Sequence, residues 1–290
     1  MSEYILLTDS SCDLPPELAE KLGIEVLPLT VTVGGKDYKN YLDGREIGFK
    51  DFYARVRGGE NAVTAAVNMD TFLSFMKPFL EKGIDILYLG FSSALSGTVT
   101  SGAMAADELR EQYPDRKIYV VDTKCASMGQ GLCVYLTALE KNKGKGIDEV
   151  YEFAKKTAPR CIHWFTVEDL FFLKRGGRVS AATAVVGTML NIKPVLHVDD
   201  EGRLINMDKS RGRKASIKAI FEKLRAAADN NLKDQTVFIS HGDCIDDARY
   251  LESMLYEAGA KEVVISYVGP VIGAHSGPGT MAVFATGDVR

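Results

Sequence analysis

The chain of 290 residues is 46% hydrophobic and 26% charged, a composition typical of folded globular proteins and not of disordered or fibrous ones. Its 35 Lys and Arg residues against 39 Asp and Glu residues give a formal net charge of −4, so no global basic field favours nucleic acid as a partner. The length is comfortable for two domains.

The cysteines and the apolar runs indicate the cellular compartment. The five cysteines are irregularly spaced and form no Cys-x-x-Cys pair, which argues against a disulfide framework and against a zinc site. The N-terminal apolar run is too short for a signal peptide, and no uninterrupted apolar run reaches the roughly 20 residues that span a bilayer. We therefore expect a cytoplasmic protein whose only contact with a membrane is peripheral.

The first 160 residues alternate apolar strands with helical patterns. Apolar runs predict strands at residues 4–8, 25–33, 84–90 and 117–121. Helical spacing predicts helices at about 16–22, 49–56, 69–80 and 98–112, followed by a helix-rich stretch to residue 158. The second strand ends at Gly34-Gly35, a hairpin signal, and residues 63–66 form a loop before a helix. This alternation predicts a mostly parallel, doubly wound sheet covered on both faces.

A serine-rich turn joins the strand at 84–90 to the helix at 98–112. Ser92, Ser93 and Ser96 lie where the helix begins, and helix N-termini at the carboxyl ends of parallel strands bind anions. The turn is therefore a candidate site for a carboxylate or a phosphate. A purely structural alternative is that Ser96 or Thr98 caps the helix while the other serines bond within the turn.

The order of elements restarts near residue 160, which predicts two domains, residues 1–160 and residues 161–290. In the second half, strands are predicted at 161–167, 193–198, 203–207, 235–241, 262–268 and 280–286. Helices are predicted at 168–173, 181–190, about 214–228 and 246–258. Residues 269–279 form a glycine-rich loop. The expected fold class is two-domain α/β, a parallel doubly wound domain followed by a second α/β domain.

Two isolated residues are candidates for ligand binding. His275 lies between Gly273 and Gly277, whose backbone freedom permits close approach to a ligand, and an imidazole can donate to a carboxylate. A buried histidine bonded to a carbonyl is the alternative. Thr64 by itself indicates only the first turn before a helix. The other three histidines lie in or at the ends of predicted strands, where packing explains them.

The chain lacks the sequence motifs of several enzyme classes. Neither a Walker-type phosphate loop nor a Gly-x-Gly-x-x-Gly after the first strand is present, which disfavours ATPases and dinucleotide enzymes. A hydrolase or acyl transferase with Ser93 as nucleophile and His275 as base stays an alternative, although the Gly-x-Ser-x-Gly elbow is absent. A phosphosugar- or nucleotide-binding regulator that uses the serine turn is a third hypothesis.

Six segments together resemble the DegV family of fatty-acid-binding proteins, which includes the B subunits of bacterial fatty acid kinase. The segments keep the family order over nearly the whole chain, at residues 8–10 (Thr-Asp-Ser), 92–98 (Ser-Ser-Ala-Leu-Ser-Gly-Thr), 170–180 (Leu-Phe-Phe-Leu-Lys-Arg-Gly-Gly-Arg-Val-Ser), 190–194 (Leu-Asn-Ile-Lys-Pro), 211–215 (Arg-Gly-Arg-Lys-Ala) and 272–279 (Ile-Gly-Ala-His-Ser-Gly-Pro-Gly). Any one of them alone is a weak signal, and six in order are specific.

The resemblance implies a site between the two domains, to which the loop 269–279 returns. One long-chain fatty acid would be buried there, its carboxylate bound by Thr64, by Ser93 with Ser92 beside it, and by His275. The family motif Thr-Ser-Gln-Pro reads Thr64-Ala-Ala-Val67 here, so the threonine is kept and its polar followers are lost. The residues expected to line the tunnel, or else to be plain core, are Met69, Phe72, Phe75, Met76, Phe165, Phe171, Phe172, Met189 and Leu190.

The resemblance also implies a partner. The carrier, itself neither an enzyme nor in need of a cofactor, would present the acid to an ATP-dependent kinase subunit that makes an acyl phosphate for phospholipid synthesis. The basic residues Lys174, Arg178 and Arg211 are then candidates for docking that kinase or an anionic membrane. An acid of roughly 14–18 carbons is expected, because each buried CH₂ contributes on the order of 0.8 kcal/mol.

Overall fold

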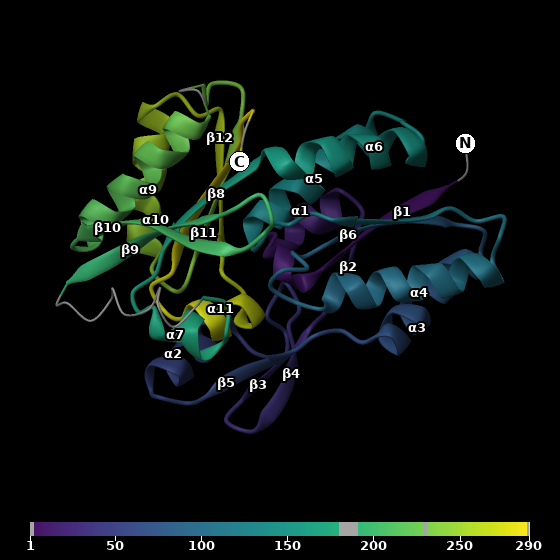
Figure 1. The fold of residues 1–290 in the computed structure, drawn as a ribbon, viewed down its shortest axis with the longest axis horizontal. Coiled ribbons are helices and arrows are strands. Elements are labelled where there is room, and N and C mark those ends of the chain that lie inside the picture. Colours follow the sequence, from purple (N-terminus) through teal and green to yellow (C-terminus); the bar gives the residue numbers. More distant parts are fainter. Residues whose placement is uncertain (1–2, 180–190, 229–230, 289) are drawn as a thin grey trace.

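The computed structural model describes residues 3–179, 191–228, 231–288 and 290. The helix predicted at 181–190, with Met189 and Leu190, lies outside the described residues. Two sheets form the body of the molecule, one parallel and one mixed, and a small third sheet lies beside them (Figure 1).

The first sheet is fully parallel, as the alternation of strands and helices predicted. Its strand order is β2 (Ile24–Leu27), β1 (Tyr4–Asp9), β6 (Asp85–Gly90) and β7 (Ile118–Asp122). Consecutive residues of a strand face opposite sides, so Leu87 and Leu89 enter one core and Ile86 and Tyr88 enter the other. The helices on the first side are α1 (Pro16–Lys21), α5 (Met128–Asn142) and α6 (Ile147–Thr157), and on the second side α3 (Met69–Glu81) and α4 (Thr98–Gln112).

The single strand predicted at 25–33 is wrong, because the chain changes sheets at Pro28. Proline has no backbone N–H to continue the β2 ladder, and the chain then forms β3 (Thr30–Val33) of a separate antiparallel sheet. β3 pairs with β4 (Lys36–Lys39) through the predicted hairpin, and with β5 (Ala62–Ala65) on its other side. Thr64 therefore lies on strand β5, opposite Val31, and not in the predicted loop.

Within the described ranges the second sheet has six strands, of which only β11 and β12 are parallel neighbours. Its order is β10 (Leu204–Arg211), β9 (Ile192–Val198), β8 (Cys161–Thr166), β13 (Met281–Thr286), β11 (Thr236–His241) and β12 (Glu262–Tyr267). The helices α9 (Arg213–Ala227) and α10 (Ile245–Glu257) pack on its outer face through a core of aliphatic side chains. The predicted hairpin of β9 and β10 is confirmed.

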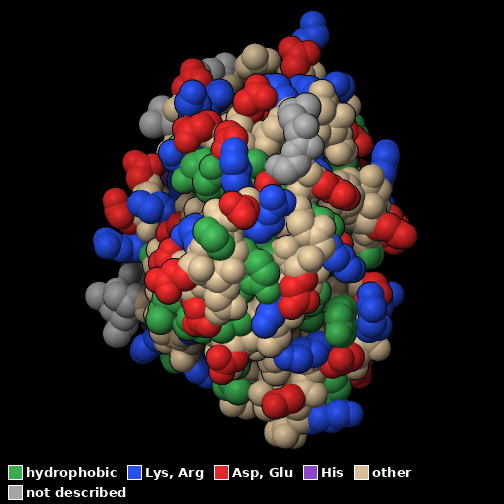
Figure 2. Space-filling model, turned by 90° about the vertical axis from the view of Figure 1, so that its right-hand side faces the viewer, with side chains coloured by type: hydrophobic (Ala, Val, Ile, Leu, Met, Phe, Trp, Pro, Cys, Tyr) green, Lys and Arg blue, Asp and Glu red, His purple; other side chains and the backbone are tan. Residues whose placement is uncertain are grey.

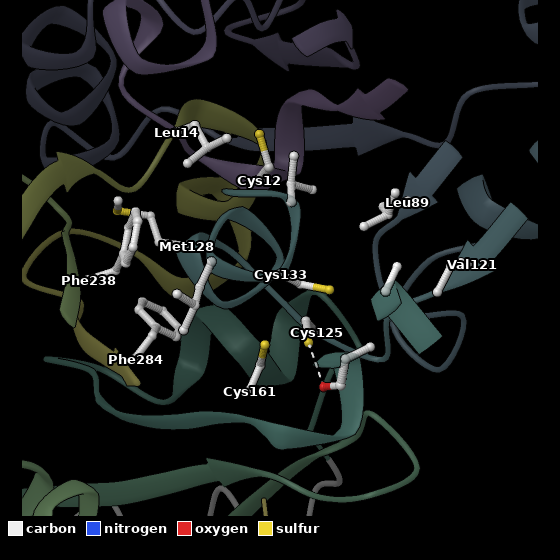
Figure 3. Close-up of a cluster of buried hydrophobic side chains, with 14 of the residues drawn as sticks. Cys12, Leu14, Leu89, Val121, Cys125, Met128, Cys133, Cys161, Phe238 and Phe284 are labelled. Carbon is white, nitrogen blue, oxygen red and sulfur yellow. Dashed lines mark hydrogen bonds between the residues drawn. The ribbon is translucent and has the colours of Figure 1, made fainter. Parts of the chain in front are cut away.

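Helix α5 joins the two large sheets. The sheets take their strands from residues 4–122 and 161–286, on either side of the predicted domain boundary, which stays a prediction. Met128 and Cys133 of α5 share one buried cluster with Leu89 of the first sheet and with Phe238 and Phe284 of the second (Figure 3). The core is thus continuous across that boundary. Burial raises the pKa of the thiols at Cys12 and Cys125 in this cluster, so they act as small apolar side chains.

The glycine-rich segment predicted as a loop contains a helix, α11 (Pro270–Ser276). Pro270 occupies the first helical position, and Gly277 follows the last with a φ of 80°, a conformation that glycine adopts without strain. Helix α11 packs against β3, β5 and α2 (Phe49–Arg57) of the first half of the chain. The segment therefore crosses from the second sheet to the first half of the molecule (Figure 1).

Buried polar groups hold the start of α11. The carboxyl of Asp13, which is 3% exposed, accepts hydrogen bonds from the Gly269 N–H at 3.0 Å and from the Ser127 hydroxyl at 2.5 Å. The buried Tyr53 hydroxyl donates to the Val268 carbonyl at 2.7 Å. Burial raises the pKa of Asp13 to about 8. A carboxyl near the beginning of the chain thus anchors a helix near its end.

The described part of the chain has no helix that is both long and apolar enough to cross a bilayer. On the face drawn in Figure 2, acidic and basic side chains are interspersed, and neither sign dominates a large area. That face offers no broad positive field.

Replacing Asp13 by Asn tests the anchor through its pH dependence. Because the folded pKa of about 8 lies above the ordinary value of 3.8, the contribution of Asp13 to the free energy of unfolding is full below pH 3.8 and is lost as the pH rises through 8. Asn keeps one acceptor and cannot ionise. We expect Asp13→Asn to become more stable than the wild type above about pH 8, measured by urea unfolding from pH 5 to 9, and an unchanged stability difference over that range would contradict this expectation.

Candidate functional site

A cavity of about 150 Å³ lies between the two halves of the molecule. Its volume is many times the roughly 10–15 Å³ that one water molecule needs. The walls are mostly apolar, and they come from the first half (Leu29, Phe91, Leu95) and the second (Phe165, Leu173, Val198, Leu204, Val268, Val271, Ile272, Ala282, Phe284). Of the described tunnel candidates, Phe165 lines this cavity, whereas Phe72 and Met76 are fully buried in the core beside α3.

Thr64 and His275 meet at the wall of the cavity, although 211 residues separate them in the sequence. The Thr64 hydroxyl oxygen lies 2.7 Å from His275 Nε2, and both residues line the cavity. Strand β5 supplies the threonine and helix α11 the histidine, and these two elements pack together. The other ring nitrogen, His275 Nδ1, is buried and has no hydrogen-bond partner among the described residues.

A positive charge lies beside this pair. Arg178 lines the cavity, half-buried, and its guanidinium donates to the Leu95 carbonyl at 3.0 Å and to the Gly176 carbonyl. Burial, and to a lesser extent the charges of Arg178 and Arg175, lower the pKa of His275 to about 4. At neutral pH the imidazole is therefore uncharged and stands next to a guanidinium. This end of the cavity is suited to an anion.

Gly176 allows the histidine to lie where it does. This glycine ends helix α7 (Phe171–Arg175), and a β-carbon at its position would overlap His275 Nδ1. A glycine at position 176 therefore has a steric reason, which the sequence pattern did not reveal. Any larger residue at position 176 must displace the imidazole.

The structure places the two predicted serines away from this pair. The Ser93 side chain is exposed and donates to Asp122 at 2.5 Å, and the Ser92 hydroxyl donates to the Gly202 carbonyl at 2.8 Å. Neither serine lines the cavity, whereas Ser96 of the same turn does. Their part in binding a carboxylate stays a prediction. Ser96, named in the sequence as part of the candidate turn, is the serine of the three that lines the cavity, whereas sequence reasoning missed the cavity-facing position of Arg178.

The geometry does not support the alternative of a serine hydrolase, because Ser93 and His275 are not paired among the described residues. The hydrogen-bond partner of the Ser93 hydroxyl is Asp122 and that of His275 is Thr64, so the described residues contain no Ser93–His275 pair. A nucleophilic serine needs a base within hydrogen-bond reach. The arrangement places a hydroxyl, an imidazole and a guanidinium beside an apolar cavity.

The other predicted basic residues lie on the surface. Lys174 is exposed, with its ammonium 5.4 Å from the centre of the Phe171 ring, and Phe171 is itself 58% exposed. Arg211 is exposed at the end of β10. Docking roles for Lys174, Arg178 and Arg211 stay predictions. No group of three potential metal ligands exists among the described residues.

Gly176→Ala tests the packing of the imidazole. The added methyl group displaces His275 from Thr64 and toward solvent, so the pKa of His275 is expected to rise from about 4 toward its ordinary value of 6.5. The measurement is an NMR titration of the imidazole. Gly48→Ala is the matched control, because a β-carbon there meets nothing within 4 Å. A pKa that stays near 4 in Gly176→Ala would show that the glycine does not position the ring.

Comparisons with known proteins agree with one another. A family model described as "Uncharacterised protein, DegV family" matches residues 4–288. A DegV domain-containing protein of Clostridium perfringens is 43% identical over 291 residues, covering 100% of this chain and 99% of that protein. One of Lactococcus lactis is 37% identical, with 97% of each chain covered.

Solved structures are similar over the whole chain. "Fatty Acid Binding of a DegV family Protein from Thermus thermophilus" has a TM-score of 0.88 at 33% identity, and the match covers 99% of this chain and 100% of that one. "Crystal Structure of DegV, a fatty acid binding protein from Bacillus subtilis" has a TM-score of 0.84 at 27% identity, with 99% and 100% covered. Together with the family model, these similarities show that the chain belongs to the DegV family.

Proposed function

We propose that this protein binds a long-chain fatty acid in the cavity between its sheets, with the carboxylate at Thr64, His275 and Arg178. The observation that carries the proposal is the pairing of Thr64 with His275 on the wall of an apolar cavity. Relatives of similar structure are described as binding fatty acids, which supports the same ligand class here.

The cavity and the polar pair match the two parts of such a ligand. Burying each CH₂ of an acyl chain contributes on the order of 0.8 kcal/mol, so the apolar walls supply most of the affinity. A carboxylate cannot be buried unpaired, because the loss of hydration is too large. The Thr64 hydroxyl, the imidazole and the Arg178 guanidinium offer donors and positive charge at one end, which fixes the orientation of the acid.

The carboxylate end faces outward in this proposal. Thr64 and His275 are only partly buried, and the cavity-lining residues Ala65, Ala66 and Gly97 are exposed. A bound acid would therefore have its tail inside and its head group within reach of a second protein. We propose that the protein is a carrier that presents this head group to an ATP-dependent kinase subunit, which forms the acyl phosphate.

Mass spectrometry of lipids extracted from the purified protein tests the ligand. We expect a monocarboxylic acid of roughly 14–18 carbons at close to one per chain, because burial of that many CH₂ groups accounts for tight binding. Thr64→Val keeps the shape of the strand residue and removes the hydroxyl. It is expected to weaken fatty-acid binding about 10- to 100-fold, the loss of one hydrogen bond to a charged group.

Thr100→Val, on the exposed face of α4, is the matched control and should bind as the wild type does. Ser93→Ala measures whether the serine leaves Asp122 to bind the carboxylate, because in that case it weakens binding as Thr64→Val does. A protein that binds no fatty acid, or a Thr64→Val variant with wild-type affinity, refutes the proposed site.

Charge reversal at Arg211 tests the kinase partnership. With a fatty acid kinase subunit, ATP and the loaded carrier, Arg211→Glu is expected to lower acyl-phosphate production roughly tenfold at low carrier concentration, because an interface charge governs the association rate. Lys218→Glu, an exposed residue of α9, is the control for net charge. Equal production by the two variants would exclude docking through Arg211, and absence of product with the wild type would exclude the partnership.

A further inference from the structure

The buried hydroxyl of Ser276 belongs to the cavity wall. Ser276 lines the cavity and is only 5% exposed, yet its Oγ has no hydrogen-bond partner among the described residues. A buried hydroxyl without a partner destabilises a protein, so such groups are rare and need a reason. The Ser276 hydroxyl is therefore a donor available to a ligand in the cavity.

Two other hydroxyls of the cavity wall, those of Ser240 and Thr280, differ from Ser276 in having hydrogen-bond partners. The Ser240 hydroxyl lies 3.0 Å from that of Ser127, which donates to Asp13. The Thr280 hydroxyl donates to the backbone carbonyls of Ser276 and Gly277 at 3.0 and 2.7 Å. The wall thus presents paired hydroxyls beside one that is unpaired.

Ser276 lies next in sequence to His275, at the end of the cavity proposed to hold the carboxylate. It follows His275 directly on α11, and consecutive residues of a helix point about 100° apart around its axis. Both residues nevertheless line the same cavity. A ligand whose carboxylate lies at His275 brings the first carbons of its chain past Ser276.

We infer that the cavity selects long-chain fatty acids that carry a hydroxyl group close to the carboxylate. A plain acyl chain covers the Ser276 hydroxyl with CH₂ groups and leaves it unpaired. A chain hydroxyl at that place pairs with it, and each group then satisfies the other. This inference rests on the proposed function and adds the substrate class.

The test compares three acids of equal chain length by calorimetry, palmitic, β-hydroxypalmitic and ω-hydroxypalmitic acid, each added to delipidated protein. The wild type is expected to bind β-hydroxypalmitic acid about 5- to 30-fold more tightly than palmitic acid, the range for one buried hydrogen bond. The ω-hydroxy acid, with its hydroxyl at the far end of the chain, should bind no more tightly than palmitic acid.

Variants at position 276 assign the preference to this serine. Ser276→Ala removes the hydroxyl and should abolish the preference while palmitic acid still binds, and Ser276→Thr retains the hydroxyl and should keep the preference. Ser240→Ala is the matched control, because it removes a lining hydroxyl that is already paired and should leave the ratio of affinities unchanged.

Equal affinity of the wild type for palmitic and β-hydroxypalmitic acid overturns the inference, and it is also the result if a water molecule satisfies Ser276. A preference that survives in Ser276→Ala, or a preference for the ω-hydroxy acid, overturns it too. Failure of all three acids to bind is a different result, because it contradicts the proposed function itself.

Discussion

The placement of helix α11 against the first half of the molecule is the constraint on which the site depends. Asp13 and Tyr53 hold the residues at its N-terminal end through buried hydrogen bonds, and β5 packs along it. Both His275 and Ser276 reach the cavity because of this one docking. The carboxyl of Asp13, whose pKa burial raises to about 8, accepts from the Gly269 N–H, and the Tyr53 hydroxyl donates to the Val268 carbonyl. The site thus depends on contacts between residues more than 200 positions apart.

The packing of α11 also determines the charge state of His275, because it buries the imidazole. Burial keeps His275 neutral, while Arg178 stays charged at any physiological pH. The positive potential at the site is therefore permanent, and the imidazole can gain a proton once an anion lies beside it, because a nearby negative charge favours the imidazolium form. In the proposed complex, binding of the carboxylate would be coupled to uptake of a proton at His275, and by linkage the affinity would rise as the pH falls toward the pKa of the histidine.

Local sequence patterns predicted most helices and strands. They did not predict features that depend on contacts between residues far apart in the sequence. The helices α3 and α4 begin at the residues that periodicity indicated, because apolar spacing and caps are local properties. The change of sheet at Pro28 and the helix after Gly269 were missed, although both carry a proline signal. That Thr64 and His275 belong together came from resemblance to a family, since nothing in the local sequence of either residue indicates the other. The steric reason for Gly176 lies wholly in a contact made 99 positions along the chain.

Ser92 of the serine turn contributes to the cavity through a hydrogen bond, although it does not line the wall as Ser96 does. Ser92 donates to the carbonyl of Gly202, in the turn between β9 and β10, and nearby Lys124 forms an ion pair with Glu201 at 3.3 Å. The ion pair is exposed and contributes little, whereas the Ser92 hydrogen bond is buried. Val198 and Leu204, on either side of that turn, form part of the cavity wall. The Ser92 hydrogen bond therefore links the hairpin of β9 and β10 to the loop that follows β6, and through that hairpin it positions the apolar residues Val198 and Leu204 of the cavity wall.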